Sequence, residues 1–399
     1  MASGLLMIAA FALTYSMIAK RLETTILTAP MLFLAFGFIL STTGIMPVAG
    51  AEAALHLVAE TTLIILLFLD AAKTDMKALR TRHVWPFRML ALGLPLSVLI
   101  GALLAWPFVG HWPIIAILLL AAILAPTDAA LGQSVISNQL VPERERRALT
   151  VESGLNDGLA LPLILLCASL TANMMEPDQT NWFLFGSKQL ILGPLVGAAI
   201  GFIGGHVLLW AKDNHTTSEP YEGVGAIAMA VCAYIGADAI GGNGFIAAFV
   251  AGLMFGDLVE KRCKFIFEFT ESEGQGLSWA AFLLIGLVLV PESIHHLNAS
   301  TLTLILGSLL IARPAAIWLS LTGTDSTPLT RLFFGWFGPR GLATALFALM
   351  VVDRIGGEYG EAILHIAVNT VWISALLHGI TAAPAAKLYG RAMARRQQD

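Results

Sequence analysis

Charged residues are scarce in this sequence. Asp, Glu, Lys and Arg make up 13% of its 399 residues, about half of the roughly 25% that is usual for soluble proteins. This composition excludes a soluble globular enzyme and a disordered chain. The formal net charge of −4 excludes a nucleic-acid-binding protein of the basic-patch type, so no nucleic-acid partner is expected.

Cysteine is also scarce, and no His/Cys grouping stands at the spacing of metal ligands. The three cysteines, Cys167, Cys232 and Cys263, are odd in number and widely separated. We therefore expect reduced packing residues rather than disulfides or a metal site. We interpret His365, like two other histidines within apolar segments, as a packing or pH-tuning residue.

Apolar residues are abundant. They make up 57% of the chain, and the mean hydropathy is +0.78. They gather in about thirteen blocks, each near the ~20 residues that a membrane-spanning helix needs. The sequence predicts an all-α polytopic membrane protein of about thirteen transmembrane helices in a lipid bilayer, without a large extramembrane domain.

Basic residues are distributed unevenly between the predicted loops. Only Lys188 and Arg354 lie in even-numbered loops, whereas the odd-numbered loops and the C-terminal tail hold most of the others, including Lys77, Arg80 and Arg82. Cytoplasmic loops carry an excess of Lys and Arg. The sequence therefore predicts an odd number of spans in the inner (plasma) membrane, with the N-terminus outside and the C-terminus in the cytoplasm.

Ionisable and polar residues interrupt five of the apolar blocks. Ionisable residues inside a span cost about 2.5–3.5 kcal/mol or more at its centre and mark candidate functional sites. They are Asp70 in FLDAAKTD, Thr127 and Asp128 in LAPTDAALGQS, Glu152, Ser153, Asn156 and Asp157 in VESGLNDGLALP, Arg313 in LLIARPAAIW, and Arg340 in GWFGPRGLATALF.

Three of these charges converge on one depth. At a rise of 1.5 Å per helical residue, Asp157, Asp128 and Arg340 lie about 15, 20 and 14 Å from one face, close to the middle of a ~30 Å hydrocarbon core. Asp70 is shallower, at about 10 Å from the cytoplasmic face, which predicts a position at the cytoplasmic entrance to the site. On its helix, Asp157 follows Ser153 by four residues and Asn156 flanks the pair. The resulting hydroxyl, amide and carboxylate groups suit an alkali cation or a hydronium ion.

Two blocks share a further pattern. Each is broken at its centre by a proline, Pro126 or Pro339, and carries a charge one or two residues later. They run in opposite directions, which is typical of inverted-repeat transporters whose broken helices cross at mid-membrane. This predicts a first repeat at 1–173, a linking helix at 186–211, a second repeat at 221–386 and a short basic cytoplasmic tail at 387–399. Asp128 would face a half-helix N-terminus and Arg340 a C-terminus.

The motifs APTDAALGQSV, ESGLNDGLAL, LIAR and FGPRGLATALF resemble those of NhaP-type monovalent cation:proton antiporters, which are related to sodium–proton exchangers. The resemblance implies a homodimer in which a six-helix core moves against a dimerisation domain. It assigns proton and cation binding to Asp157, completed by Thr127, Asp128 and Ser153, with Asp70 nearby. Glu152 would pair with Arg313, and Asn156 would hold that pair.

The resemblance predicts exchange of Na⁺, or of Li⁺ or K⁺, for H⁺ in pH homeostasis, without enzymatic activity or a cofactor. A single Asp after Asn is the family's mark of electroneutral exchange. Proton and cation would compete for Asp157, since burial favours the protonated carboxylate and a bound cation favours the charged one. The transported cation would lie on Asp157, Asp128 and Ser153. The alternative is a proton- or sodium-coupled carrier of solutes or anions on the same fold. Asp128 as a simple helix cap, Asp70 as an interfacial residue and Arg340 as a gating residue also remain open.

Overall fold

In the computed structural model, the structure describes residues 2–22, 25–46, 51–74, 84–128, 131–136, 138–175, 182–259 and 262–396, and the regular elements among them are helices. No strand occurs among these residues. The first helices are α1 (Ala2–Leu22), α2 (Ala29–Thr42), α3 (Ala51–Ala72), α5 (Val84–Arg88), η1 (Met89–Gly93), α6 (Leu94–Val109), α7 (Ile114–Ile123), α8 (Gln133–Ile136) and α9 (Glu143–Met175).

The second part of the chain is also helical. Its elements are α10 (Trp182–Asp213), α11 (Glu219–Asp238), α12 (Gly244–Val259), α13 (Lys264–Leu284), η2 (Ile285–Leu289), α14 (Val290–His295), α15 (Ala299–Gly307), η3 (Ser308–Ala312), α16 (Arg313–Ser320), α17 (Pro328–Trp336), α18 (Leu342–Ile355) and α19 (Gly357–Arg396). The tail expected from 387 is thus the end of a helix up to Arg396. Residues 397–399, and Lys77, Arg80 and Arg82 of the charge alternation, lie outside the described residues.

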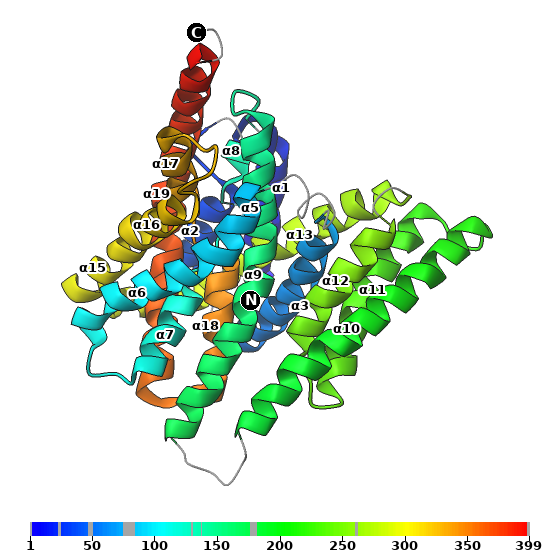
Figure 1. Cartoon of the computed structure of the whole chain (residues 1–399), viewed down its shortest axis with the longest axis horizontal. Helices are drawn as coiled ribbons and strands as arrows, with labels where there is room; N and C mark the ends of the chain where they lie inside the picture. Colours follow the sequence, from blue (N-terminus) through cyan, green and yellow to red (C-terminus); the bar gives the residue numbers. More distant parts are fainter. Residues whose placement is uncertain are drawn as a thin grey trace.

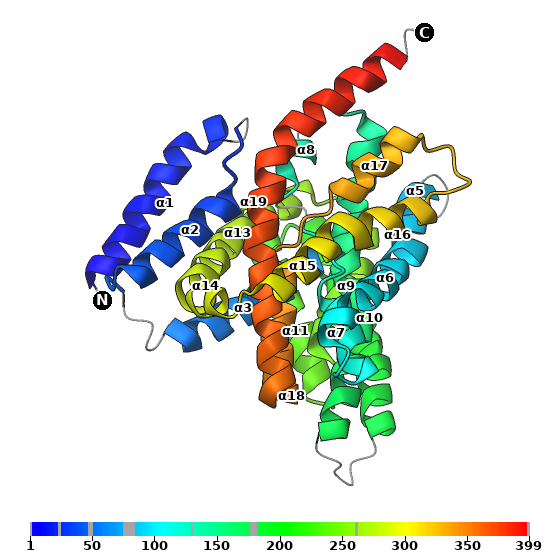
Figure 2. The same cartoon turned by 90° about the vertical axis from the view of Figure 1, so that its left-hand side faces the viewer.

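The helices form one tilted bundle. Helices α10, α11 and α12 stand together on one side, and α6, α7, α15 and α16 stand on the other (Figure 1). Helices α3, α9 and α18 lie between these groups. Helices α1 and α2 lie at the periphery (Figure 2), where α2 packs on α13. The ionisable and polar residues in the middle of the bundle come from α3, α9, α16 and the non-helical chain that follows α7 and α17.

The bundle has the apolar surface of a multi-pass membrane protein. Among the described residues, nine helical segments are long and apolar enough to cross a membrane, and four apolar helices are shorter. Large apolar side chains are exposed on its outer helices, for example Leu6 and Met17 on α1 and Leu195 and Ile203 on α10. The predicted apolar blocks coincide with helices or with runs of consecutive helices. The count of thirteen spans stays a prediction.

Three long helical segments contain a π-helical turn, and each turn ends two residues before a proline. The turns η1, η2 and η3 precede Pro95, Pro291 and Pro314. Proline lacks an N–H group, and its ring clashes with the carbonyl of the preceding turn. A wider turn relieves the clash without ending the helix. The last of these turns leads directly into Arg313.

Close packing of α12 on α3 depends on glycine. A Cβ atom on Gly252 would lie 2.1 Å from the carbonyl oxygen of Phe68, and one on Gly256 would lie 2.1 Å from that of Ala72. Only hydrogen fits at either position, so the two backbones approach directly. This geometry is typical of small-residue contacts between membrane helices. It places α3, with Asp70 near its end, firmly against its neighbour.

The cysteines are all free, as the sequence predicts. Cys167 and Cys263 are buried, which fits a packing role. Cys232 is exposed on α11, so the packing interpretation does not hold for it in this chain alone.

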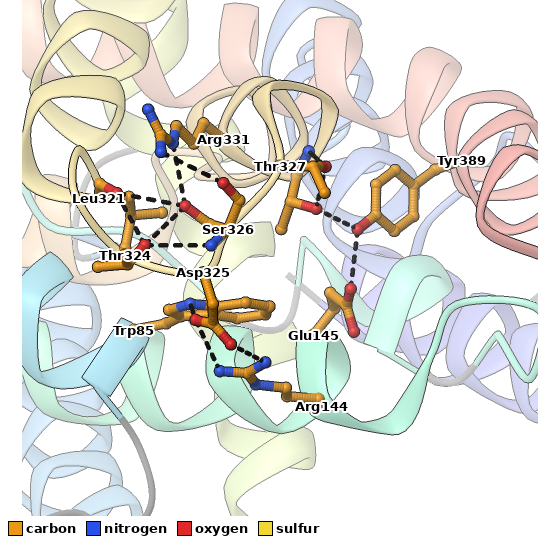
Figure 3. A network of polar contacts seen from close by, with 11 residues as sticks. Trp85, Arg144, Glu145, Leu321, Thr324, Asp325, Ser326, Thr327, Arg331 and Tyr389 are labelled. Carbon is orange, nitrogen blue, oxygen red and sulfur yellow. Dashed lines mark hydrogen bonds and ion pairs between the residues drawn. The ribbon is translucent and has the colours of Figure 1, made fainter. Parts of the chain in front are cut away.

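A polar network joins the ends of α5, α9, α17 and α19 (Figure 3). Arg144 donates hydrogen bonds of 2.6 and 3.0 Å to Asp325, and its guanidinium lies 3.6 Å from the ring centre of Trp85. The Trp85 indole also donates to Asp325, at 2.7 Å. Beside them, Tyr389 donates to Glu145 at 2.9 Å. These contacts join elements far apart in sequence at one end of the bundle.

Removing Asp325 from this network should weaken the fold at neutral pH. The bound Arg144 guanidinium, aided by Trp85, holds the pKa of the Asp325 carboxyl below its ordinary value. Its stabilising contribution is therefore present above the ordinary Asp pKa of about 3.9 and is lost as the pH falls through the lower folded-state pKa. For this exposed pair we expect Asp325→Asn to destabilise the protein by about 0.2–1 kcal/mol at pH 7. Thermal unfolding in detergent would measure it, and a gap that did not narrow below about pH 4 would contradict this cause.

Candidate functional site

Two interrupted helices meet in the middle of the bundle. Helix α7 ends at Ile123 and α17 ends at Trp336, and each is followed by non-helical chain that contains a proline. The backbone N–H of Asp128, in the first stretch, donates to the carbonyl of Pro339, in the second, at 2.8 Å. The crossing predicted from the two prolines is therefore confirmed. The opened backbone satisfies part of its hydrogen bonding across the crossing, as buried chain must.

A charge lies at the helix end of opposite sign on each side of the crossing. The Asp128 carboxylate accepts the N–H of Leu342, in the first turn of α18, at 2.8 Å. The Arg340 guanidinium donates to the carbonyls of Leu124, which caps α7, and Gly338, at 2.5 and 2.6 Å. Arg340 is only 1% exposed. Both contacts expected with the helix dipoles are present, and for Arg340 they favour dipole compensation over gating.

The glycines on either side of Pro339–Arg340 make room for these charges. A Cβ atom on Gly341 would lie 1.9 Å from Asp128 Oδ2, and one on Gly338 would lie 1.6 Å from Arg313 Nε. The sequence analysis did not predict a role for either glycine. The GPRG motif could have indicated one, since glycines commonly mark positions where a backbone approaches another group closely.

A buried ion pair supports the crossing from the side. Arg313 donates to both carboxylate oxygens of Glu152, at 2.9 and 3.0 Å, and both side chains are 3% exposed. Asn156 donates to Thr127 at 2.5 Å and to Glu152 at 3.5 Å. The predicted Glu152–Arg313 pair, with Asn156 beside it, is therefore confirmed. Such a pair holds register well, because separating its members would leave a buried charge without compensation.

The structure corrects the predicted polar face of α9. Asn156 was expected beside Ser153 and Asp157 on one face, but its amide instead turns to Thr127 and Glu152. A helix rotates by about 100° per residue, so Asn156 and Asp157 point in different directions. The amide is therefore part of the support rather than of the cavity described next.

A cavity of about 140 Å³ lies beside the crossing. It brings together five of the predicted site residues, namely Asp70, Thr127, Asp128, Ser153 and Asp157. Lys73, Ser278 and Gln275 also line it and were not predicted as site residues. Carboxylate and hydroxyl oxygens thus converge from α3, α9 and the opened chain after α7. These are hard ligands of the kind that suit alkali cations.

In the part of the chain that the structure describes, Asp157 is the cavity-lining carboxylate whose hydrogen bonding is incomplete, while outside the cavity Asn156 Oδ1 and Arg313 Nε are also buried without a partner. Among the described residues, the Oδ1 atom of Asp157 is buried without a hydrogen-bond partner. A buried polar atom left in this state costs about 1–3 kcal/mol, and more for a charged group. The position of that atom in an oxygen-lined cavity fits a site at which a proton or a cation supplies the missing interaction.

A second cavity, of about 230 Å³, lies on the other side of two leucines. Leu63 and Leu346 line both cavities, and each is 3% exposed. The second cavity is also lined by the polar residues His56, Glu60, Tyr234 and Arg354. The Tyr234 hydroxyl donates to the Glu60 carboxylate. Two cavities that each contain ionisable side chains are therefore separated by Leu63 and Leu346, which form an apolar layer between them.

Residues 6–388 match the family described as "Sodium/hydrogen exchanger, transmembrane". The chain belongs to this family. The match covers all the helices that form the crossing and the two cavities. The family resemblance predicted from the motifs is therefore confirmed.

The chain is also similar to individual proteins that are named as antiporters. The chain is 29% identical over 395 residues to the "K(+)/H(+) antiporter NhaP2" of Shewanella sp. (strain ANA-3), covering 96% of this chain and 66% of that protein, which is just under two-thirds of its length. It is 25% identical to the "Probable Na(+)/H(+) antiporter 2" of Methanocaldococcus jannaschii, covering 81% and 78%. The solved sodium proton antiporter MjNhaP1 of that organism has the same fold, with a TM-score of 0.76 at 21% identity over 97% of this chain and 98% of that one.

Proposed function

We propose that this chain is a secondary antiporter that exchanges a monovalent cation for H⁺ across the membrane. The observation that carries the proposal is the unpaired, buried Asp157 oxygen in a cavity lined by Asp128, Asp70, Ser153 and Thr127. Membership of the sodium/hydrogen exchanger family and the names of the relatives support it. These names include both K⁺ and Na⁺. We therefore propose Na⁺ and K⁺ as candidate substrates, together with Li⁺ from the sequence analysis.

Exchange follows from competition for one carboxylate. A proton and a cation both neutralise Asp157, so each displaces the other. An empty, charged site would be costly to move past the apolar layer, whereas either loaded form would be neutral there. Ser153 and Thr127 would supply neutral oxygens to the cation, and Asp70 would attract it into the cavity. The family resemblance, in which a single Asp follows Asn, supports electroneutral transport.

Arg340, Glu152 and Arg313 would act without binding the ion. Arg340 offsets a helix dipole at the crossing, and Glu152 with Arg313 fixes its geometry. Asp128 would have both roles, support and ion binding, since one of its oxygens caps α18 while the residue lines the cavity. We propose no resident cofactor.

The membrane arrangement is part of the proposal. The charge distribution supports an N-terminus outside and a C-terminus in the cytoplasm of the plasma membrane. The opposed, proline-broken helices support two inverted repeats, at 1–173 and 221–386, joined by the helix at 186–211. The family resemblance supports a homodimer and a role in pH homeostasis.

Reconstitution tests the proposal. Liposomes that hold the protein and a pH-sensitive dye are given a proton gradient, and Na⁺, Li⁺ or K⁺ is then added. We expect cation-dependent, saturable dye recovery that identifies the ion. Protein shown to be folded that gives no recovery with any cation would favour the second candidate, a coupled solute or anion carrier. The three carboxylates of the first cavity, against the single Lys73, argue against an anion.

Shortening a side chain in the apolar layer of Leu63 and Leu346 should let protons cross without an exchanged cation. Leu346→Ala would remove most of a side chain that separates the two cavities. We expect cation-independent proton leak to rise several-fold, because water could then connect the cavities. The loss of a buried leucine also costs about 2–5 kcal/mol, so thermal unfolding must be measured in parallel.

Leu349→Ala is the matched control for this effect. Leu349 is likewise buried on α18, at 6% exposed, but it lines only the second cavity. Its removal should leave the leak unchanged. Equal leak in the two variants would show that the layer formed by Leu63 and Leu346 is not the barrier.

A further inference from the structure

A cluster of metal-binding side chains lies outside the two cavities, where α14 meets α19. Glu292 comes from α14, His296 caps that helix, and His365 lies in the third turn of α19. One ligand atom from each lies within 4.8 Å of the others. Glu292 and His296 are exposed and His365 is half-buried, so an ion in water can reach them. The sequence gives no sign of this group, because His365 is far along the chain from the other two.

The two histidines are already arranged together. Their rings stack with centroids 4.1 Å apart and planes 6° from parallel. Tetrahedral zinc has Zn–N bonds of about 2.0–2.1 Å, which places its ligand atoms about 3.4 Å apart. Stacked rings point their in-plane lone pairs in parallel, so one ion meets both nitrogens only after His296 turns out of the stack. His296 and Glu292 are exposed and can turn toward a metal while His365 and both helices stay in place.

A buried hydrogen-bond chain orients His365. Its Nδ1 atom lies 3.1 Å from the Ser293 hydroxyl. Asn369 donates to the Ser293 carbonyl at 2.6 Å, and Trp372 donates to Asn369 at 2.8 Å. When Nδ1–H donates to the hydroxyl, Nε2 presents its lone pair to a metal. Histidine ligands in metal sites are commonly fixed in this way by a second partner.

We propose that Glu292, His296 and His365 form a binding site for a divalent transition-metal cation, with Zn²⁺ as its representative. Two imidazole nitrogens and one carboxylate oxygen suit zinc and its neighbours in the first transition row, and not an alkali cation. Water would complete the coordination. The site is distinct from the all-oxygen cavity at Asp157, and its occupant links α14 to α19.

Occupancy of the site should slow exchange, a consequence that rests on the proposed function. Alternating access requires helices of the bundle to move against one another, and α14 packs directly on α19. A metal coordinated from both helices would hold them in one position. Zn²⁺ would then act as an inhibitor from outside the transport cavity.

Metal binding is tested first, without reference to transport. The full chain, with any polyhistidine tag removed, is titrated with ZnCl₂ in detergent by calorimetry. We expect one Zn²⁺ per chain and a higher thermal unfolding midpoint when Zn²⁺ is present. His296→Ala and His365→Gln should each weaken binding at least about 10-fold, and Ser293→Ala should weaken it by about 10-fold through loss of ring orientation.

His295→Ala is the matched control, because it removes a neighbouring exposed histidine that is not in the cluster. Zn²⁺ affinity should be unchanged in it. His296 is exposed at a helix end, so His296→Ala should fold even if His365→Gln does not. Zn²⁺ binding that survives His296→Ala, or that falls equally in His295→Ala, overturns the site.

Flux assays then test the consequence. Saturating Zn²⁺ should slow cation-dependent proton movement several-fold in the wild type and leave His296→Ala unaffected. Inhibition that persists in His296→Ala, or its absence in a wild type that binds Zn²⁺, overturns the link to exchange. A lack of exchange without any Zn²⁺ counts against the proposed antiport, whereas the calorimetry judges the metal site by itself.

Discussion

Asp157→Asn is expected to abolish cation-dependent proton movement, to the level of empty liposomes. The amide keeps the shape of the carboxylate but neither takes up a proton in the working range nor neutralises a cation. Dye recovery in liposomes measures the loss. Exchange that persists in this variant would rule out Asp157 as the shared site.

The same substitution should leave the fold intact or make it more stable. In the structure, Asp157 Oδ1 is buried without a hydrogen-bond partner among the described residues, so the carboxylate contributes little to folding when no ion is bound. Functional sites often carry such unfavourable groups, and neutralising them commonly stabilises a protein. Thermal unfolding of the two proteins side by side therefore separates a transport defect from a folding defect. A sharply lower midpoint would indicate a structural role instead.

Glu152→Ala should have the largest effect on stability. It would leave the Arg313 guanidinium, which is 3% exposed, without its counter-charge in the middle of the bundle. Breaking a buried ion pair in this way costs about 3–5 kcal/mol. We expect a large fall in the unfolding midpoint and in the yield of monodisperse protein, measured by size-exclusion chromatography after heating.

The double variant Glu152→Leu with Arg313→Met is the control for this argument. Removing both charges replaces the pair with apolar groups of similar volume, which is often neutral or stabilising. We expect it to regain most of the lost stability, apart from the contacts that Thr127 and Asn156 make with Glu152. A double variant as unstable as Glu152→Ala would show that packing at this position, rather than charge, holds the crossing.

Much of the fold could be predicted from the sequence because the membrane acts on the chain locally. The apolar blocks became helical except where Pro126 and Pro339 interrupt two of them, since a span must satisfy its own backbone. Pro126 and Pro339 located the interruptions, because a proline cannot continue the hydrogen bonding of a buried helix. Charges in a membrane are too costly to stand alone. This constraint is why the pairing of Glu152 with Arg313, and the contacts of Asp128 and Arg340 with helix ends, could be foreseen.

Other features depend on how the helices are rotated and placed against one another, and a one-dimensional pattern does not contain this information. The turn of Asn156 away from Asp157 follows from contacts with Thr127 and Glu152 across the crossing. The apolar layer of Leu63 and Leu346 exists only because α3 and α18 lie side by side between two cavities.

The sequence by itself determined that this is a helical membrane protein with carboxylates inside its apolar segments, because hydropathy and the cost of buried charge are properties of each segment alone. Only the tertiary structure decided which oxygens share a cavity and which residues separate it from the next. The same is true of His365, which meets Glu292 and His296 through the packing of α19 on α14. Such meetings depend on helix tilt and register, which are set by the close packing of the whole bundle.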